Sequence, residues 1–259
     1  MDIFAPETWA AYDPDGLIAL RLEQINRILP PDVKTILDAG CGNGVITNAL
    51  HERYDVTGLD LSPAALEYVK APKVIASVTA IPFPNASFDL VMCNEVLEHL
   101  SGADLAQAVT ELKRCSARYL LVSVPNREQL ETELVRCQDC GHIFHAYGHL
   151  QSFDLSRLDS LLGWQRIWDQ TLGPRSRDFS PALLSFRQKV LQQWFKPDLP
   201  LACPICRSRK FRLRKNLLTK AVNALGWLGR KARPYWLMAM YKAPSNRASG
   251  SDRNHPPWI

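Results

Sequence analysis

The chain has 259 residues, of which 46% are hydrophobic and 22% charged, as in ordinary globular proteins. It contains no run of about 18 apolar residues, which argues against a membrane-spanning helix. Its acidic start lacks the basic and then apolar stretch of a secretion signal, so we expect a cytoplasmic protein.

The net charge of +5 is unevenly distributed along the chain. Residues 199–259 hold thirteen Lys or Arg residues and a single acid, Asp252, whereas the preceding part is mildly acidic. Such a basic part suggests contact with an anionic partner, and a solvated basic surface explains it equally well. We expect no DNA partner.

The predicted elements alternate between strands and helices, which predicts an α/β fold with a doubly wound, mostly parallel sheet of seven strands. Strands are predicted at 35–39, 55–60, 74–78, 88–93, 119–124, 164–168 and 235–241. Helices are predicted at 45–53, 62–70, 104–115, 155–162 and about 181–194. The predicted parts are a helical segment at 1–30, a core at 31–172 with a Cys- and His-rich loop at 127–150, an inserted basic cap at 173–233, a final core strand at 234–243 and a disordered tail at 244–259.

A glycine-rich loop, from Asp38 to Gly44, follows the first predicted strand. In an open parallel sheet, ligands bind beyond the carboxyl ends of the strands, which is where this loop lies. Its glycines, Gly40, Gly42 and Gly44, allow a tight turn and a close approach to a ligand. Asp60 ends the second strand, where a carboxylate can accept hydrogen bonds from both hydroxyls of a ribose.

Two further segments follow in order: Ile81-Pro82-Phe83-Pro84, and Asn94-Glu95-Val96-Leu97-Glu98-His99-Leu100. With the glycine loop and Asp60, they resemble the class I S-adenosylmethionine (SAM)-dependent methyltransferases, especially their small-molecule branch. The resemblance covers roughly residues 33–126, and 149–170 more loosely. It implies a Rossmann-like methyltransferase fold with SAM as the cofactor.

The resemblance also implies roles for single residues. Asp38, Gly40 and Gly42 would flank the methionine portion of SAM, and Asp60 would hold the ribose. The remaining cofactor-binding positions are Leu61 after Asp60, Ser77, Val78 against the adenine, and Asn94, whose backbone would lie near the methionine end. The family commonly has an acid at the position of Ser77, where it accepts a hydrogen bond from the adenine amino group; serine can accept one too.

Methyl transfer to a hydroxyl requires an acceptor held in line with the sulfonium methyl group and a base that removes a proton. His99 and His149 are the candidate bases, since imidazole titrates near physiological pH. A structural histidine bonded to the backbone is the alternative for each. Glu95, Glu98 and His99 form an E-x-x-E-H pattern, similar to the segment that holds a divalent metal in ubiquinone-pathway O-methyltransferases.

Two C-x-x-C pairs, Cys137/Cys140 and Cys203/Cys206, predict a second kind of site. Each pair lets two thiolates bind one ion from a single turn, and two such turns complete a tetrahedral shell for a structural zinc ion. The long gap between the pairs means that the ion would connect two distant loops. Four unrelated thiols are the alternative.

The predicted zinc site, in which His142 or His145 could replace one cysteine, would fasten the cap at 173–233 over the cofactor's open side. The segment 207–233 of this cap is basic and then has apolar residues at helical spacing. It could meet an anionic lipid, a lipid-linked acceptor or a phosphate-bearing substrate. A helix packed on the sheet with its polar face in water is the ordinary interpretation.

We therefore expect a SAM-dependent methyltransferase with a zinc-stapled cap that methylates oxygen on a small molecule or on a glycan or lipid intermediate, in the cytoplasm or peripherally at the membrane. One alternative is an RNA methyltransferase that holds its substrate with the zinc module and basic segment. Residues 94–97 lack the Asn-Pro-Pro-Tyr type of motif, which argues against base N-methylation. The other alternative is a non-catalytic binding protein with a SAM-type fold.

Overall fold

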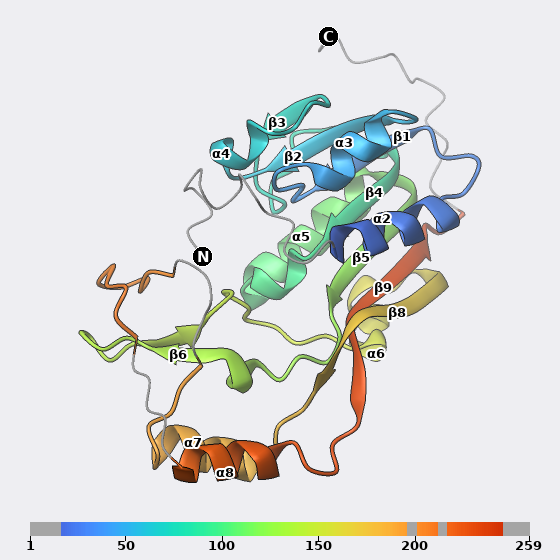
Figure 1. Cartoon of the computed structure of the whole chain (residues 1–259). Coiled ribbons are helices and arrows are strands. Elements are labelled where there is room, and N and C mark those ends of the chain that lie inside the picture. The colour runs from blue at the N-terminus through green and yellow to red at the C-terminus, as the bar shows by residue number, and fades with distance from the viewer. Residues whose placement is uncertain (1–16, 196–200, 212–216, 246–259) are drawn as a thin grey trace.

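The computed structural model describes residues 17–195, 201–211 and 217–245, and its centre is a seven-stranded sheet (Figure 1). The strand order is β3-β2-β1-β4-β5-β9-β8; β9 runs antiparallel to both β5 and β8, and the other neighbouring strands pair in parallel. The strands are β1 (Thr35–Ala39), β2 (Asp55–Asp60), β3 (Lys73–Ile75), β4 (Phe88–Asn94), β5 (Ser116–Pro125), β8 (Gln165–Arg177) and β9 (Ala232–Lys242). The predicted seven-stranded, mostly parallel sheet is confirmed.

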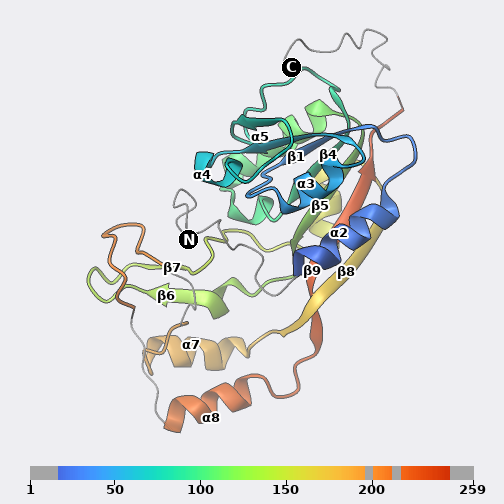
Figure 2. The same cartoon turned by 45° about the horizontal axis from the view of Figure 1, so that its top comes forward.

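Helices cover both faces of the sheet (Figures 1 and 2). The helices α2 (Leu17–Ile28) and α3 (Val45–His51) pack on one face, and α5 (Gly102–Cys115) and α6 (Leu155–Leu162) pack on the other. The short helix α4 (Pro63–Leu66) begins at Ser62, whose side chain accepts a hydrogen bond from the backbone N–H of Ala65. This layering makes the sheet the buried middle layer.

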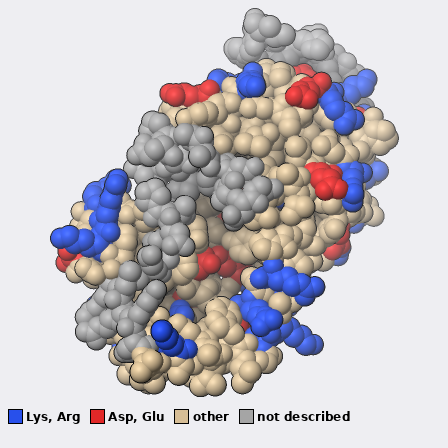
Figure 3. All heavy atoms as spheres, viewed as in Figure 1, with Lys and Arg blue, Asp and Glu red and all other residues tan. Residues whose placement is uncertain are grey.

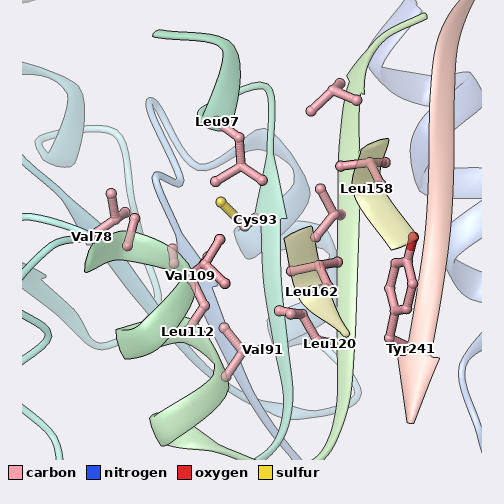
Figure 4. Close-up of a cluster of buried hydrophobic side chains, with 14 of the residues drawn as sticks. Val78, Val91, Cys93, Leu97, Val109, Leu112, Leu120, Leu158, Leu162 and Tyr241 are labelled. Atoms are coloured by element: carbon pink, nitrogen blue, oxygen red, sulfur yellow. The ribbon is translucent and has the colours of Figure 1, made fainter. Parts of the chain in front are cut away.

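The central strand β4 shows how the sequence builds both cores. All of its residues are buried, as a central parallel strand requires. Because successive side chains point to opposite faces, Val91 and Cys93 pack under α5 and α6, whereas Leu90 and Met92 pack under α2 and α3. Figure 4 shows the first of these clusters, which extends to Tyr241 on β9.

The last two strands of the sheet run past its edge and carry a helical pair. Arg177 of β8 still pairs with Ala232 of β9, so the strands extend into both ends of the segment expected as an inserted cap at 173–233. The segment between them forms α7 (Pro181–Lys189) and α8 (Leu217–Gly226), which lie side by side at the far end of the molecule (Figures 1 and 2). We call residues 178–231, as far as the structure describes them, the α7–α8 unit.

A small ribbon stands apart from the main sheet, in the loop expected at 127–150. It consists of the antiparallel strands β6 (Leu134–Arg136) and β7 (Ile143–His145), preceded by the 3-10 helix η3 (Leu130–Glu133). A second 3-10 helix, η2 (Leu97–His99), follows β4. Of the predicted N-terminal segment, α2 is described; residues 1–16, and 246–259 of the predicted tail, lie outside the described ranges. Within those ranges, every helix is too short or too polar to cross a bilayer.

Candidate active site

The glycine loop is fastened to the end of β2. After β1 the chain turns through Gly40, Gly42 and Gly44, whose φ angles of 83°, 55° and 73° lie in the left-handed region that glycine adopts without strain. The N–H of Gly42 donates to Oδ2 of Asp60 at 2.8 Å, and the N–H of Gly40 donates to the carbonyl of Leu59 at 2.7 Å. The loop and Asp60 therefore form one rigid edge at the carboxyl ends of β1 and β2.

Two carboxylates lie at this edge in different environments. Asp60 accepts a second hydrogen bond, from the N–H of Ser62 to Oδ1 at 2.8 Å, so its orientation is fixed. Asp38 is buried, and its Oδ2 accepts a hydrogen bond from the hydroxyl of Thr47 at 2.7 Å. Burial raises the pKa of Asp38 to about 6, with the hydroxyl of Thr47 opposing this rise and the charge of Asp60 adding to it.

Asn94, the last residue of β4, provides a test of whether the cofactor fits. Both polar atoms of its side-chain amide are buried and have no hydrogen-bond partner among the described residues. An unsatisfied buried amide is costly, so a polar partner at this position would stabilise the site. That the backbone of Asn94 lies near the methionine end of SAM stays a prediction.

The residues predicted to bind the adenine part of SAM offer fewer free polar groups. The hydroxyl of Ser77 lies 2.7 Å from that of Thr79 and accepts a hydrogen bond from the N–H of Thr79 at 3.1 Å, so it is engaged locally. The side chain of Val78 packs into the hydrophobic core (Figure 4), and its place against the adenine stays a prediction. Leu61, directly after Asp60, is half-exposed.

The structure brings the two predicted bases together. His99 comes from η2 after β4, and His149 comes from the loop after β7; their ring centroids are 4.8 Å apart, edge to face. Nδ1 of His149 lies 2.6 Å from Oε2 of Glu128, a residue that sequence reasoning missed. The available signal was its position three residues after the end of β5, at the same carboxyl edge of the sheet.

His149 and Glu128 are largely enclosed by protein, whereas His99 is exposed to solvent. Burial lowers the pKa of His149 to about 4. Partial desolvation and the neighbouring His149 lower the pKa of His99 as well. Burial raises the pKa of Glu128 to about 7. Both imidazoles are therefore neutral at physiological pH, the form in which a histidine accepts a proton.

The E-x-x-E-H pattern does not assemble as one set of ligands. Glu95 has a left-handed φ of 55°, and its carboxylate is already occupied. Its Oε1 accepts a hydrogen bond from the hydroxyl of Ser123 at 2.7 Å, and its Oε2 accepts one from Nε1 of Trp236 at 2.8 Å. The guanidinium of Arg21 lies 3.8 Å away. Glu95 thus acts in a hydrogen-bond network that connects β4, β5, β9 and α2.

Glu98 faces the histidines instead. It is fully buried, and both of its carboxyl oxygens lack a hydrogen-bond partner among the described residues. Glu98, His99 and His149 each offer one ligand atom within 4.8 Å of the others. Burial raises the pKa of Glu98 well above its usual range, because a carboxylate without partners is costly in the interior. This group could share a proton or hold a cation.

His145 belongs to the same neighbourhood and not to the cysteines. Its ring stacks on His149 with centroids 4.8 Å apart. Its Nδ1 accepts hydrogen bonds from the backbone N–H groups of Tyr147 at 3.3 Å and His149 at 3.2 Å, so the proton of the neutral ring lies on Nε2. That atom faces carboxylate oxygens of Glu128 and Glu133, 3.6 and 3.7 Å away. The suggestion that His145 replaces a cysteine ligand is therefore wrong.

The four cysteines of the C-x-x-C pairs meet although more than sixty residues separate the pairs. All four sulfur atoms lie within 4.8 Å of one another. The nearest pairs are Cys137 with Cys206 at 3.5 Å and Cys140 with Cys203 at 3.6 Å. His142 stacks on Phe144, with ring centroids 5.7 Å apart. The predicted meeting of the two distant loops is therefore present in the fold.

Both cysteine loops have the same local geometry. The N–H of Gly141 donates to the carbonyl of Cys137, and the N–H of Arg207 donates to the carbonyl of Cys203. Gly141 and Arg207 have left-handed φ angles of 74° and 60°. The backbone N–H of Cys140 is the main cause that lowers the pKa of the Cys137 thiol, to about 6. Two equivalent turns thus present their sulfur atoms to one point.

A cavity of about 460 Å³ lies between the carboxyl edge of the sheet and the α7–α8 unit. Glu128, Phe153 and Arg157 line it from the sheet side, and Phe179 and Arg230 line it from the α7–α8 unit. Glu128 also contacts His149, so this one lining residue connects the cavity to the candidate base. His149 itself and the residues of the glycine loop are not among those that line the cavity.

The strand order, the glycine loop and the acid that ends β2 define a Rossmann-like nucleotide-cofactor fold of the methyltransferase type. Residues 37–118 match the family model described as a methyltransferase domain. A ubiquinone biosynthesis O-methyltransferase of Xylella fastidiosa is 30% identical over an alignment of 146 positions that covers 49% of this chain and 59% of that protein. A malonyl-[acyl-carrier protein] O-methyltransferase of Halorhodospira halophila is 36% identical over an alignment of 108 positions that covers 38% of this chain and 35% of that protein.

Among solved structures, a SAM-dependent methyltransferase from Archaeoglobus fulgidus superposes with a TM-score of 0.53 at 15% identity, over 87% of this chain and 94% of that one. This likeness shows the shared fold. The chain spans between about a third and three fifths of the length of the two O-methyltransferases above. Together these findings support a SAM-dependent methyltransferase, with residues 37–118 as its matched domain.

Proposed function

We propose that the protein transfers the methyl group of SAM to an oxygen atom of a small molecule or of a glycan or lipid intermediate. The observation that carries this proposal is the bond between His149 and Glu128 beside the cavity at the carboxyl edge of the sheet. A neutral imidazole held by a carboxylate is suited to removing a proton from a hydroxyl. The O-methyltransferase relatives support the same chemistry.

The glycine loop, Asp38, Asp60 and Asn94 would hold SAM in this proposal. The carboxylate of Asp60 keeps acceptor capacity for ribose hydroxyls after its two backbone bonds. The unsatisfied amide of Asn94 and the carboxyl of Asp38 suit the methionine end. Bound SAM supplies an electrophilic methyl group on its sulfonium, so the chain's own task is positioning and proton removal.

His149 is the base that we propose. Its Nδ1–H donates to the carboxylate of Glu128, which leaves the lone pair on Nε2 free to take the acceptor's proton. The ionised carboxylate then stabilises the imidazolium that forms. His99, packed edge to face against His149, holds the ring from the other side and is the second candidate.

A second candidate chemistry uses a divalent cation held by Glu98, His99 and His149. The observation that favours it is the fully buried carboxylate of Glu98, which has no partner among the described residues. Such a cation would polarise an acceptor hydroxyl in place of a base. Activity of a dialysed protein with and without added magnesium distinguishes the two, because a base alone needs no metal.

We also propose that the four cysteines bind a structural zinc ion. Four sulfur atoms gathered by two equivalent turns are the donor set of a closed, tetrahedral site. The ion would connect the 127–150 loop, which carries Glu128 and His149, to the chain that leads into α8. It would thereby support the candidate base without taking part in the reaction.

Transfer of radiolabelled methyl groups from SAM into a cell extract tests the proposed function. The extract is then fractionated into lipids, glycans, RNA and small molecules. We expect label in an ether or ester of one of the non-nucleic-acid fractions. Label confined to RNA, with steeply salt-dependent binding, would show the RNA methyltransferase instead. SAM binding by calorimetry without transfer into any fraction would show a non-catalytic protein.

A further inference from the structure

The helix α8 has two apolar faces, and the α7–α8 unit buries only one of them. Thr219, Val222 and Gly226 are buried against the neighbouring residues. Gly226 sits so close to Phe179 that an added Cβ would lie 1.9 Å from the phenyl ring, and the N–H of Ser180 donates to the carbonyl of Gly226 at 2.9 Å. This face is therefore fully used in packing within the protein.

The other face of α8 is apolar and points outward. Leu217, Leu218 and Leu225 are 83%, 52% and 57% exposed, and with Ala221 they lie within about 100° of one another around the helix axis. Leu228, just beyond the helix, is 75% exposed. A solvated helix of a globular protein normally places charged residues there, so this face is suited to contact with an apolar environment.

The unit has further exposed apolar side chains. They are Phe186 and Val190, in and just after α7, and Trp227 after α8, whose ring also packs edge to face on Phe179. Half-buried and exposed aromatic side chains of this kind suit the boundary between water and a lipid layer. We call the outward apolar residues of the unit the exposed patch; they are Phe186, Val190, Leu217, Leu218, Leu225, Trp227 and Leu228.

Apart from Asp178 at the start of the unit, which pairs with Arg233 at 2.7 Å, the charged side chains described in the unit are basic. Lys189, Lys220, Arg230 and Lys231 are exposed beside the exposed patch, and the described residues between 181 and 245 include no Asp or Glu. Figure 3 shows this lower end of the molecule as mostly uncharged surface that bears Lys and Arg, with acidic side chains in the hollow above it. An anionic surface would therefore be attracted by the charges and would cover the leucines.

We infer that the α7–α8 unit docks on an anionic lipid bilayer, with the exposed patch inserted at the interface and the basic side chains at the headgroups. The charge complementarity selects a lipid surface over a second copy of the chain, since two copies of a basic patch repel each other. The cavity that Glu128 lines is also lined by Phe179 and Arg230 of the same unit, so docking would place it near the bilayer.

Co-sedimentation of the full chain with vesicles tests this inference. The vesicles are phosphatidylcholine alone, or phosphatidylcholine with about 30% phosphatidylglycerol. We expect binding to the anionic vesicles at least about 10-fold tighter than to the neutral ones, and weaker as salt rises. The double variant Leu225→Gln/Leu228→Gln should lose at least about 10-fold in affinity.

A matched control removes an equally exposed apolar side chain elsewhere. Ile75 on β3 is 60% exposed, and Ile75→Gln should bind the vesicles as the unchanged protein does. Binding of S-adenosylhomocysteine should be equal in all variants, which separates a loss of docking from a loss of fold. Because vesicle binding is measured without methyl transfer, a failure of the docking inference can be distinguished from a failure of the proposed reaction.

Several outcomes would overturn the inference. One is binding that the leucine variants leave unchanged. Another is that the unchanged protein forms a dimer, seen by light scattering, and does not bind anionic vesicles, while the leucine variants are monomers. A third is salt-sensitive binding to single-stranded RNA in the absence of vesicle binding, which would assign the basic surface to nucleic acid.

Discussion

The Nδ1 atom of His149 lies 2.6 Å from Oε2 of Glu128, and Glu128 also lines the cavity beside the carboxyl edge of the sheet. This contact joins the two ends of the 127–150 loop, which is distant from the glycine motif in sequence. It determines which nitrogen of His149 carries the proton, and therefore whether Nε2 can act as a base.

The first prediction concerns the pH dependence of the turnover number kcat. Burial raises the pKa of Glu128 to about 7. Above that pH the carboxylate accepts the Nδ1–H of His149 and Nε2 is free. Below it, protonated Glu128 donates to Nδ1, the ring proton moves to Nε2, and the base is lost. We therefore expect kcat to rise with pH through about 7, measured with the acceptor found by extract labelling.

The variant Glu128→Gln tests the same contact. Glutamine has a similar shape but lacks the charge that stabilises the imidazolium, so kcat should fall, by less than the roughly 10²–10⁴-fold expected for His149→Ala. The rise through pH 7 should disappear. The affinity for SAM should stay unchanged, which serves as the internal control. A Glu128→Gln protein with full kcat and an intact pH profile would remove Glu128 from the mechanism.

The second prediction concerns cofactor affinity. Burial raises the pKa of Asp38 to about 6, and the ionised form attracts the ammonium group of SAM. The association constant should therefore increase as pH rises from about 5 to 7 and then level off. Isothermal titration at several pH values measures this. Asp38→Asn should bind more weakly at pH 7 and show no such increase; an unchanged pH dependence in that variant would point to another group.

The general fold could be predicted because its signals are local. A buried parallel strand such as β4 is a short apolar run, and the Asp38–Gly44 turn marks where the first such strand ends. Once strands and helices alternate, topology rules place all carboxyl ends at one edge. The aromatic and apolar residues of β9 predict a strand at 235–241. They do not predict its extension back to Ala232, because that extension depends on pairing with Arg177 of β8.

The candidate site was less predictable because its contacts are not local. Glu95 and Glu98 are three residues apart and look equivalent in the sequence. Their different roles depend on the left-handed φ of Glu95 and on Trp236, which is 141 residues away. The partnership of Glu128 with His149 likewise depends on how the 127–150 loop folds back, which no motif in that loop records.

The third prediction concerns metal content. A protein purified without chelators should contain about one zinc ion per chain, and Cys203→Ser should lose it, since three thiolates bind less tightly than four. The midpoint of thermal unfolding should then fall by about 5 °C or more. Elemental analysis and calorimetry measure these.

The control for this prediction is Cys115→Ala. Cys115 is equally buried but lies at the end of α5, outside the sulfur cluster. It should keep the zinc. Two results would show that the four thiols are not a zinc site. One is an equal zinc content in Cys203→Ser and Cys115→Ala, and the other is an unchanged chain that contains no zinc.

The fourth prediction concerns the glycine loop. Gly40 has a φ of 83°, and an added Cβ would lie 2.3 Å from Cγ2 of Val96. Gly40→Ala therefore meets two costs, a left-handed backbone and a steric clash, and should lower the free energy of unfolding by about 2–4 kcal/mol. Chemical denaturation measures this loss. Binding of SAM should weaken too, because the loop must move away from the end of β2.

The double variant Gly40→Ala/Val96→Ala separates the two costs. It removes the clash but not the backbone strain, so it should be at least about 1 kcal/mol more stable than the sum of the single changes predicts. Gly102→Ala, at the start of α5, is the control: nothing lies within 4 Å of its added Cβ, and alanine favours a helix. Equal losses of unfolding free energy from Gly40→Ala and Gly102→Ala would show that the loop does not need glycine. If the effects of Gly40→Ala and Val96→Ala on the unfolding free energy are strictly additive, the whole cost lies in the backbone.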